Sequence, residues 1–381
     1  MRFRKWLLVD GVSQYGVLND FTASVAASLE ELGFEAKMVP GLVNTLATLV
    51  QEEKPDVLFA FNGMQNVWED GVDLFDRLEV LSVAWLVDDP RYHMGRFLNP
   101  ASRYLRLVCI DRAHVNWLKD KQGLTALFLP HAGDARYLTS VDRNRPIDVF
   151  FAGTFTTPIN IQKEAQQKMS KTIYLLFCDL IDIYQYGIDF EETLTAILNA
   201  RFIHGINESE FRVLRDFLWM WVDRYLRNAQ REKMLKSLPK NARIVVSGKG
   251  EWEAVLADFP DVVILPPLSF PDLISLMQQS KVVVNLSSFH TDGSHERIYY
   301  ALIAGAAVIT NPSPFLREVF KDGEHVVYYD PEAPMLDEII CSLNETYRLL
   351  MAEQGQRFVL ANHTWKHRLG SLIEWLKCVH N

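Results

Sequence analysis

The chain has 381 residues, which is too long for one ordinary hydrophobic core and fits two domains of typical size. Its 49% of hydrophobic and 23% of charged residues are typical of a well-packed soluble protein. A net charge of −9 argues against general nucleic-acid binding, which needs a basic surplus. The four cysteines are far apart and form no CxxC pair, which favours reduced thiols in the cytoplasm over a disulfide framework or a zinc site.

The N-terminal segment resembles a signal peptide only in its charges. Arg2, Arg4 and Lys5 precede an apolar stretch, residues 6–9, that is too short for the apolar region of a signal peptide. We therefore expect a first β-strand at 4–10. No apolar run approaches membrane-spanning length, because Asp179 and Asp182 interrupt the longest candidate. We expect a cytoplasmic protein without a membrane span.

The first part of the chain alternates short apolar runs with helical patterns. A loop with Gly11 and Gly16 follows the first strand, and a helix is predicted at 19–32, stopped by Gly33. Further apolar runs, each ending in polar residues, are 57–62, 81–89, 105–111 and 126–133. This alternation predicts a parallel sheet covered by helices on both faces.

The carboxyl ends of parallel strands line the ligand crevice in such sheets. We therefore expect Asp10, Asp88, Asp89 and His131 in one neighbourhood. Adjacent acids repel unless they are solvated or used, and a metal site, as in glycosyltransferases with a DxD motif, is one interpretation. The order here is DD followed by Pro90, which favours acceptor binding or capping. His131 is a candidate general base or ligand hydrogen-bonder, or a structural histidine.

A second series of apolar runs predicts a second α/β sheet, at 147–155, 242–252, 262–267, 281–288, 306–312 and 325–330. The domain boundary is placed in the polar, turn-prone segment near 143–146, which gives domains at 1–145 and 146–362. The helical stretch 165–237 is too long for one crossover and is interpreted as several helices, a cap or acceptor-side insertion. The amphipathic last helix, in 363–381, is predicted to pack back on the first domain.

The segment 291–305 is a candidate anion site. Turn residues lead to Ser294, the predicted N-cap of a helix from about His295 to Ala304, and Gly305 ends that helix. Free N–H groups and the helix dipole attract an anion, and Arg297 adds a fork of donors that suits phosphate. The alternative is that Glu296 and Arg297 form a solvated first turn.

A second candidate is the strand end at Gly248, Lys249 and Gly250. Glycines permit close backbone approach to a ligand and Lys249 offers a charge. The spacing is neither that of a Walker A loop nor GxGxxG, so a plain glycine turn is the alternative.

These segments together resemble a GT-B glycosyltransferase. More narrowly, the chain is similar to the spore-maturation (CgeB-type) group with the Glyco_trans_1_2 C-terminal domain. The matching stretches are "WLVDDP", "LPHAG", "DVFFAGTF", "VVSGKGEW", "VVVNLSSFHTDGSHERIYYALIAGAAVITN", "LREVFKDGEHVVYYD" and "RFVLANHTWKHRLGSLIEWL". The resemblance implies two Rossmann-like domains facing across a cleft, with a nucleotide-sugar donor, expected to be a UDP-sugar, in the second domain.

The resemblance also implies roles for residues. Arg297, Lys249 and the helix N–H groups would hold the diphosphate, the loop 266–270 would contact the base, and the loop 11–16 would close over the phosphates. Neither a metal ion nor a cofactor is expected. The expected catalytic residues are Asp88, Asp89, His131 and Arg297. The implied donor-binding residues are Gly11, Gly16, Lys249, Gly250, Pro267, Leu268, Ser269, Asp292, Gly293, Ser294, His295, Glu296, Arg297, Tyr300 and Glu318.

One departure from the family pattern bears on these roles. Related retaining enzymes carry two glutamates separated by seven residues at this helix, and the positions hold Asp292 and Tyr300 here. Glu318 or Glu296 is expected to compensate. Three functions stay open: a transferase acting on a glycan, protein or other acceptor, a binding or scaffold protein without turnover, and a sugar-nucleotide epimerase. The sugar, the acceptor and the stereochemical outcome also stay open.

Overall fold

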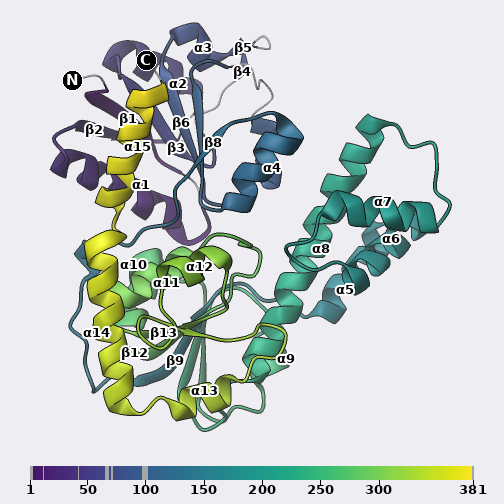
Figure 1. Ribbon diagram of the computed structural model, residues 1–381, viewed down its shortest axis with the longest axis vertical. Helices are drawn as coiled ribbons and strands as arrows, with labels where there is room; N and C mark the ends of the chain where they lie inside the picture. Colours follow the sequence, from purple (N-terminus) through teal and green to yellow (C-terminus); the bar gives the residue numbers. More distant parts are fainter. Residues whose placement is uncertain are drawn as a thin grey trace.

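The computed structural model describes residues 3–11, 13–41, 43–64, 68–69, 72–96 and 102–379. Within these residues the chain forms two six-stranded parallel sheets, one above the other in Figure 1, and a helical module beside them. In this part of the chain, no helix combines the length and apolar character that a membrane crossing needs.

The N-terminal sheet has the strand order β2-β1-β3-β6-β7-β8. Its strands are β1 Lys5–Val9, β2 Glu35–Val39, β3 Val57–Phe61, β6 Leu81–Leu86, β7 Leu105–Cys109 and β8 Ala126–Phe128. The central strands β3 and β6 are buried along their whole length, because helices cover both faces of the sheet. The edge strand β2 is absent from the sequence-based prediction, since only Val39 of its five residues is buried.

Helices and short turns connect these strands. The helices are α1 Val17–Glu31, α2 Val43–Glu53, α3 Leu74–Leu78 and α4 Arg112–Gln122. A small hairpin, β4 Trp68–Glu69 and β5 Val72–Asp73, precedes α3. Single 3-10 turns are η1 Gln14–Gly16, η2 Pro90–Tyr92, η3 Met94–Arg96 and η4 Ala135–Tyr137.

The C-terminal sheet has the order β11-β10-β9-β12-β13-β14. Its strands are β9 Ile147–Ala152, β10 Ile244–Ser247, β11 Val262–Leu265, β12 Ser280–Asn285, β13 Ala307–Thr310 and β14 Val327–Tyr328. Its helices are α9 Glu253–Leu256, α10 Phe270–Gln278, α11 Glu296–Ile303, α12 Pro314–Val319, α13 Leu336–Ser342 and α14 Glu345–Asn362. All six predicted apolar runs of this half overlap a strand of the sheet.

The long stretch between β9 and β10 forms four helices that project to one side of the molecule (Figure 1). They are α5 Pro158–Lys168, α6 Lys171–Ile183, α7 Phe190–Ala200 and α8 Glu208–Lys236. The module has its own apolar core, which includes Phe177, Leu194, Leu218 and Trp219. The base of α8 reaches the second domain, where Met234 and Leu235 join the core of the C-terminal sheet.

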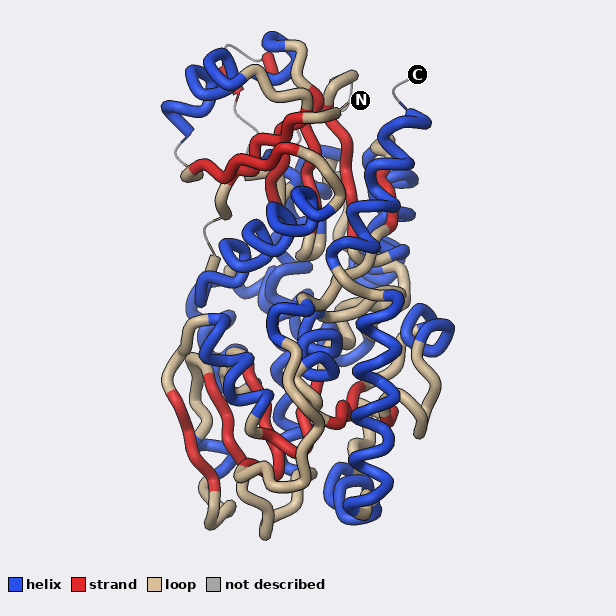
Figure 2. Tube along the Cα trace, turned by 90° about the vertical axis from the view of Figure 1, so that its left-hand side faces the viewer, coloured by secondary structure: helices blue, strands red, loops and turns tan. Residues whose placement is uncertain are grey.

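The last helix, α15 Trp365–Val379, leaves the second domain and packs on α1 of the first. Figure 2 shows α14 and α15 running along both domains on one side of the molecule. Trp365 is 1% exposed and lies within 6 Å of the rings of Phe21, Phe61 and Trp85, measured between ring centroids. Its indole nitrogen donates to the Tyr300 hydroxyl of α11 at 3.1 Å. One of the apolar clusters therefore runs through both domains.

Candidate functional site

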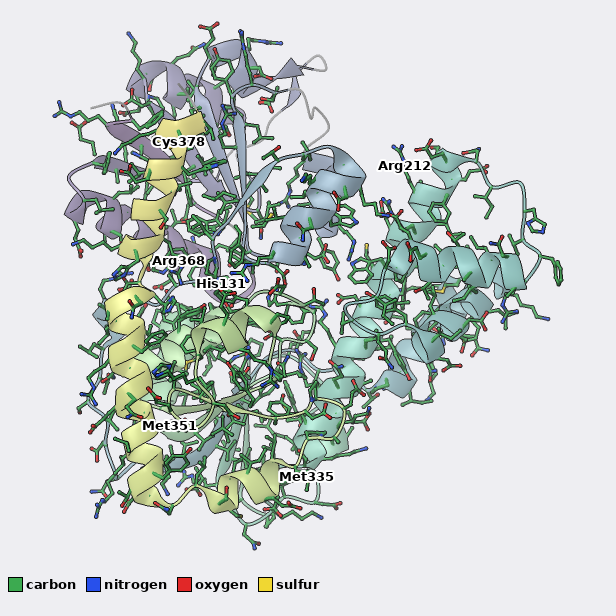
Figure 3. All side chains as sticks on the ribbon, viewed as in Figure 1. His131, Arg212, Met335, Met351, Arg368 and Cys378 are labelled. Atoms are coloured by element: carbon green, nitrogen blue, oxygen red, sulfur yellow. The ribbon has the colours of Figure 1, made fainter. Side chains whose placement is uncertain are left out.

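The two domains face each other across a cleft at the carboxyl ends of their strands. The cleft has a volume of about 510 Å³. The first domain contributes Asn62, Asp88 and His131, while the second contributes the N-terminal turn of α11. His131 lies where the domains meet (Figure 3), and its carbonyl accepts from Arg368 of α15 at 3.1 Å.

Helix α11 begins one residue later than the sequence predicts. His295 is the N-cap, and its Nδ1 accepts from the Arg297 amide at 3.3 Å. The predicted N-cap, Ser294, has no exposed surface, and its hydroxyl is hydrogen-bonded to the Tyr299 hydroxyl at 2.8 Å. That prediction is wrong because the serine hydroxyl is used in the core instead of at the helix end.

Arg297 points from this turn into the cleft. Its Nη1 donates to Asn285 Oδ1 at 2.8 Å, and its guanidinium carbon lies 5.4 Å from the centroid of the Phe151 ring. Burial lowers the pKa of Arg297 below its ordinary value. The first turn is therefore largely enclosed, and the alternative of a solvated turn does not describe it.

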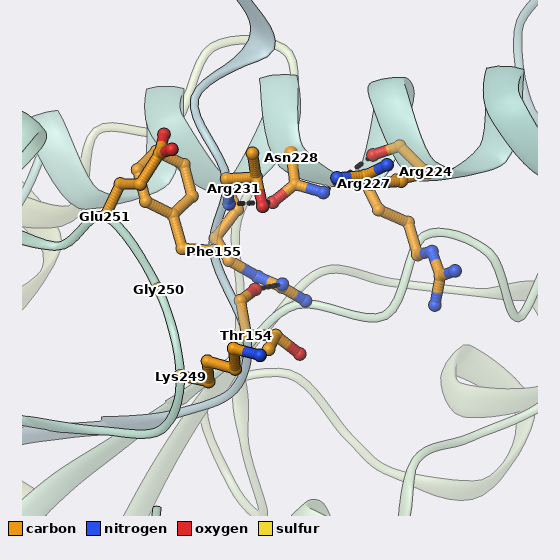
Figure 4. A pocket seen from close by; sticks show the side chains of 10 residues that line it. Thr154, Phe155, Arg224, Arg227, Asn228, Arg231, Lys249, Gly250 and Glu251 are labelled. Atoms are coloured by element: carbon orange, nitrogen blue, oxygen red, sulfur yellow. Dashed lines mark hydrogen bonds between the residues drawn. The ribbon is translucent and has the colours of Figure 1, made fainter. Parts of the chain in front are cut away.

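A second arginine, Arg231, reaches the same place from the helical module. Its Nη1 donates to the carbonyl of Thr154, as Figure 4 shows, and its guanidinium lies 5.6 Å from the same Phe151 ring. Burial, Arg227 and Arg297 lower the pKa of Arg231 to about 9. Among the residues that the structure describes, neither Arg231 nor Arg297 forms an ion pair with a carboxylate.

Cations also gather in the adjoining cavity, whose volume is about 660 Å³. Lys249 and Gly250, both predicted site residues, line it together with Arg224, Arg227 and Arg231 of α8 (Figure 4). The three arginines are absent from the sequence-based prediction. Their spacing of three and four residues puts them on one face of α8, but only the tertiary position of the module brings that face to the cleft.

Glu296 brings a carboxylate into the cleft beside two histidines. Its Oε2 lies 2.8 Å from His295 Nδ1 and 3.7 Å from His131 Nε2. Burial alone would raise the pKa of Glu296, but His295, His131 and Arg297 hold it below its ordinary value. Burial lowers the pKa of His131 to about 4. The group therefore presents an ionised carboxylate next to a neutral imidazole at pH 7.

The two adjacent aspartates have different surroundings. Asp89 is 8% exposed, and its carboxylate accepts from the amide of Arg91 at 2.9 Å, so it caps η2. Asp88 faces the cleft, where it accepts from Asn62 Nδ2 at 2.8 Å and lies 3.5 Å from His93 Nε2. Asp89 therefore has the capping role that was one of the predicted alternatives. No group of three His, Cys, Asp or Glu side chains in the described part of the chain is arranged to hold a metal ion.

A narrower recess of about 150 Å³ continues from the cleft at the carboxyl ends of β9 and β10. Pro267 and Leu268, predicted to contact a base, line it, whereas Ser269 caps α10 by accepting from the Asp272 amide at 3.3 Å. Gly11 and Gly16 do not line the recess, but Tyr15 between them does. Tyr15 has a φ of 68°, a left-handed backbone that turns this loop over the opening.

Several predicted donor-binding residues lie away from the cleft. Tyr300 is fully buried against Phe270 and Trp365, so it does not reach a ligand. Glu318 forms a two-point ion pair with Arg112 of the first domain, at 2.6 and 3.1 Å.

Asp292 and Gly293 lie at the same contact between the domains, where the Asp292 carbonyl accepts from the Arg112 amide at 3.1 Å. Of the predicted acidic substitutes, only Glu296 faces the cleft.

Comparison with known proteins bears on both halves of the chain. Residues 227–374 match the model of a family described as Glycosyl transferase-like. No curated protein matches the chain in sequence. AviGT4, a glycosyltransferase involved in avilamycin A biosynthesis, superposes with a TM-score of 0.58 at 11% identity and covers 98% of both chains.

Two further solved structures have the same architecture. Anabaena HepE in complex with UDP-glucose gives a TM-score of 0.58 at 12% identity, covering 98% of this chain and 99% of that one. An alpha-glucosyltransferase in complex with UDP-glucose and DNA gives a TM-score of 0.58 at 11% identity, covering 98% of both chains.

The fold is GT-B. The predicted fold class is thereby confirmed, and the family resemblance is supported over residues 227–374; the spore-maturation subgroup stays a prediction. In a GT-B fold, the cleft described above lies between the two Rossmann-like domains.

Proposed function

We propose that the protein is a glycosyltransferase that takes a sugar from a nucleotide-diphosphate sugar. The carrying observation is the convergence of Arg231 and Arg297 on the end of β9, without carboxylate partners in the described residues. Like charges held together in a partly enclosed site are unfavourable unless an anion joins them. A diphosphate supplies that anion and matches the two donor forks.

The remaining parts of a donor fit the neighbouring surfaces. The recess lined by Pro267, Leu268 and Tyr15 is next to Arg297 and suits an aromatic base. The sugar would then lie toward Glu296 and His131. UDP is proposed as the nucleotide because solved structures of the same fold contain UDP or UDP-glucose.

The proposed reaction transfers the glycosyl group to a hydroxyl of the acceptor. The bond between the anomeric carbon and the diphosphate oxygen breaks, the acceptor oxygen bonds to that carbon, and the nucleoside diphosphate leaves with the electron pair. Arg231, Arg297 and Lys249 stabilise the charge that grows on the leaving group. The proton of the acceptor hydroxyl passes to the ionised Glu296 or to the leaving diphosphate, and in the second case Glu296 stabilises positive charge on the sugar ring. In this proposal protein cations serve the diphosphate without a metal ion.

A nucleotide panel tests the proposal. UDP, GDP, ADP and their glucose conjugates are added to the full chain, and the melting temperature is measured. A ligand at one hundred times its Kd stabilises the folded state by about 2.7 kcal/mol, which is readily detected. We expect UDP and UDP-sugar to stabilise most, and release of UDP from the sugar nucleotide to be measurable. If no nucleotide diphosphate raises the melting temperature, the proposed function is wrong; if nucleotides bind without turnover, the protein is a binding protein.

A further inference from the structure

A second large cavity opens on the other side of α8. It lies between the helical module and the second domain and has a volume of about 530 Å³. Its walls are the turn after α6, one face of α8, and the segments 288–291 and 311–314 of the second domain. We call this cavity the module groove. His290 lines both the module groove and the cleft, so the two cavities meet at this residue.

Three polar side-chain atoms around the module groove lack hydrogen-bond partners. Gln230 Oε1, Ser288 Oγ and His290 Nδ1 are buried atoms without a hydrogen bond among the described residues. His290 is only 3% exposed. Buried polar atoms are nearly always hydrogen-bonded in folded proteins, so three such atoms beside one cavity favour a polar occupant of that cavity.

The described residues that line the groove are rich in tyrosine and offer no unpaired cation to an anionic ligand, and the carboxylate of Asp182 lies among them. The cation of the groove, Lys233, is paired with Glu332 at 2.6 Å, and Gln230 donates to the same Glu332 carboxylate at 2.6 Å. The side chains of Tyr184 and Tyr225 supply ring surface, while amides and hydroxyls supply donors and acceptors. Ring surface combined with neutral hydrogen-bonding groups suits a polyhydroxylated, uncharged ligand.

The two faces of α8 differ in the ligand that they favour. Arg224, Arg227 and Arg231 face the cavity beside the diphosphate site, whereas Tyr225, Ala229 and Gln230 face the module groove. The arginine face of α8 therefore favours an anionic ligand, and the opposite face favours a neutral one. His290 connects the groove to the reacting end of the cleft, since its ring lies 6.0 Å from that of His295 and 6.5 Å from that of His131.

We propose that the module groove binds the acceptor of the transferase and that this acceptor is a neutral saccharide. The inference rests on the proposed function, because it supplies the second substrate of the same reaction. The helical module then has two roles: α8 holds the donor diphosphate through Arg231 and forms one wall of the acceptor site.

Saturation-transfer NMR on the full chain tests this inference. The probes are maltotetraose, cellotetraose and chitotetraose, with a sulfated heparin tetrasaccharide as the anionic comparison. Ala229→Trp fills the groove, and Met220→Trp is the matched control, since Met220 is 50% exposed on the same helix and does not line the groove. Ser288→Ala removes one hydroxyl that has no hydrogen-bond partner, with little change in volume. This second variant keeps the test valid if Ala229→Trp does not fold.

We expect at least one neutral tetrasaccharide to receive saturation from the wild type and from Met220→Trp. The signal should fall at least fivefold in Ala229→Trp and severalfold in Ser288→Ala. The inference is overturned if no neutral tetrasaccharide binds, if only the heparin tetrasaccharide binds, or if both groove variants bind as the wild type does. The shift in melting temperature with UDP reports separately on the donor site. Its absence contradicts the proposed function, whereas the saccharide experiment alone shows whether the module groove binds a neutral saccharide.

Discussion

At the scale of single residues, Arg231 is the side chain that most directly tests the diphosphate site. A hydrogen bond to a charged group is worth about 1.5–3 kcal/mol, so Arg231→Ala should weaken UDP binding roughly 10- to 100-fold. Arg231→Lys should also weaken it, because the lysine lacks the two-point fork. Without nucleotide, Arg231→Ala should keep or raise the melting temperature, since it removes the burial of a charge and the repulsion from Arg227 and Arg297, which together lower the pKa of Arg231. Titration calorimetry with UDP and a thermal melt measure the two effects.

The matched control is Arg212→Ala on the same helix. Arg212 is 62% exposed and pairs with Glu208 on the surface of the module. Its removal should leave the Kd for UDP unchanged. Equal weakening by both variants would show that the charge of α8, and not the position of Arg231, attracts the nucleotide.

The buried imidazole of His131 predicts a pH dependence of stability. Its pKa is lowered from 6.5 to about 4 in the folded protein, chiefly by burial. Between these values the unfolded chain binds a proton that the folded protein does not, so stability falls as the pH falls from 6.5 to 4. From pH 7 to pH 5 the loss due to this group is about 2 kcal/mol.

His131→Gln should remove this loss, so the variant should be destabilised less than the wild type between pH 7 and pH 5. Urea unfolding at both pH values measures the difference. His204→Gln, at an exposed histidine between α7 and α8, controls for removing a histidine as such. An unchanged pH dependence in His131→Gln would show that His131 is not the group that resists protonation.

At the scale of elements, the sequence predicted most strands, because their apolar runs are continuous and buried on both faces. The edge strand β2 was missed since its pattern of burial is that of an exposed segment. Some of the residues that line the candidate site were named from the sequence. Arg297, Glu296 and Lys249 follow from local signals at strand and helix ends, whereas Arg231 has none. It lies 77 positions from Thr154, its partner, and only the packing of the module joins them.

The crossover helix α15 should contribute to stability mainly through Trp365. This side chain is 1% exposed and contacts both domains. Trp365→Ala should lower the free energy of unfolding by about 3–5 kcal/mol, because the cavity is only partly refilled. Trp375→Ala, at a partly buried position of the same helix, should cost less. Urea unfolding measures the free energy of unfolding of both variants. If both variants lose the same amount, α15 stabilises the protein by covering apolar surface in general and not through the contact of Trp365 with both domains.

At the scale of the whole molecule, the relative position of the two domains depends on a close backbone contact at Gly293. A Cβ there would lie 2.6 Å from the Ile110 carbonyl oxygen and 3.0 Å from Asp111 Cα, both backbone atoms of the first domain. Gly293→Ala should therefore push the domains apart and break the bond from the Arg112 amide to the Asp292 carbonyl. Overpacking of this kind typically costs about 1–3 kcal/mol.

The consequence for function differs between the two halves of the cleft. The proposed diphosphate and base sites belong mainly to the second domain and its module, so UDP affinity should change less than threefold in Gly293→Ala. In the proposed reaction the sugar lies toward His131 of the first domain, so turnover should fall by about tenfold or more, since small misplacements of reacting groups are costly. Hydrogen exchange of the Arg112 amide should become faster at the same time.

Gly370→Ala in α15 is the control, because a Cβ there meets no atom within 4 Å. This variant should stabilise the helix by about 0.5–1 kcal/mol without affecting turnover. If Gly293→Ala keeps full turnover while the Arg112 amide exchanges faster, the cleft does not need both domains in the observed position, and catalysis belongs to the second domain alone.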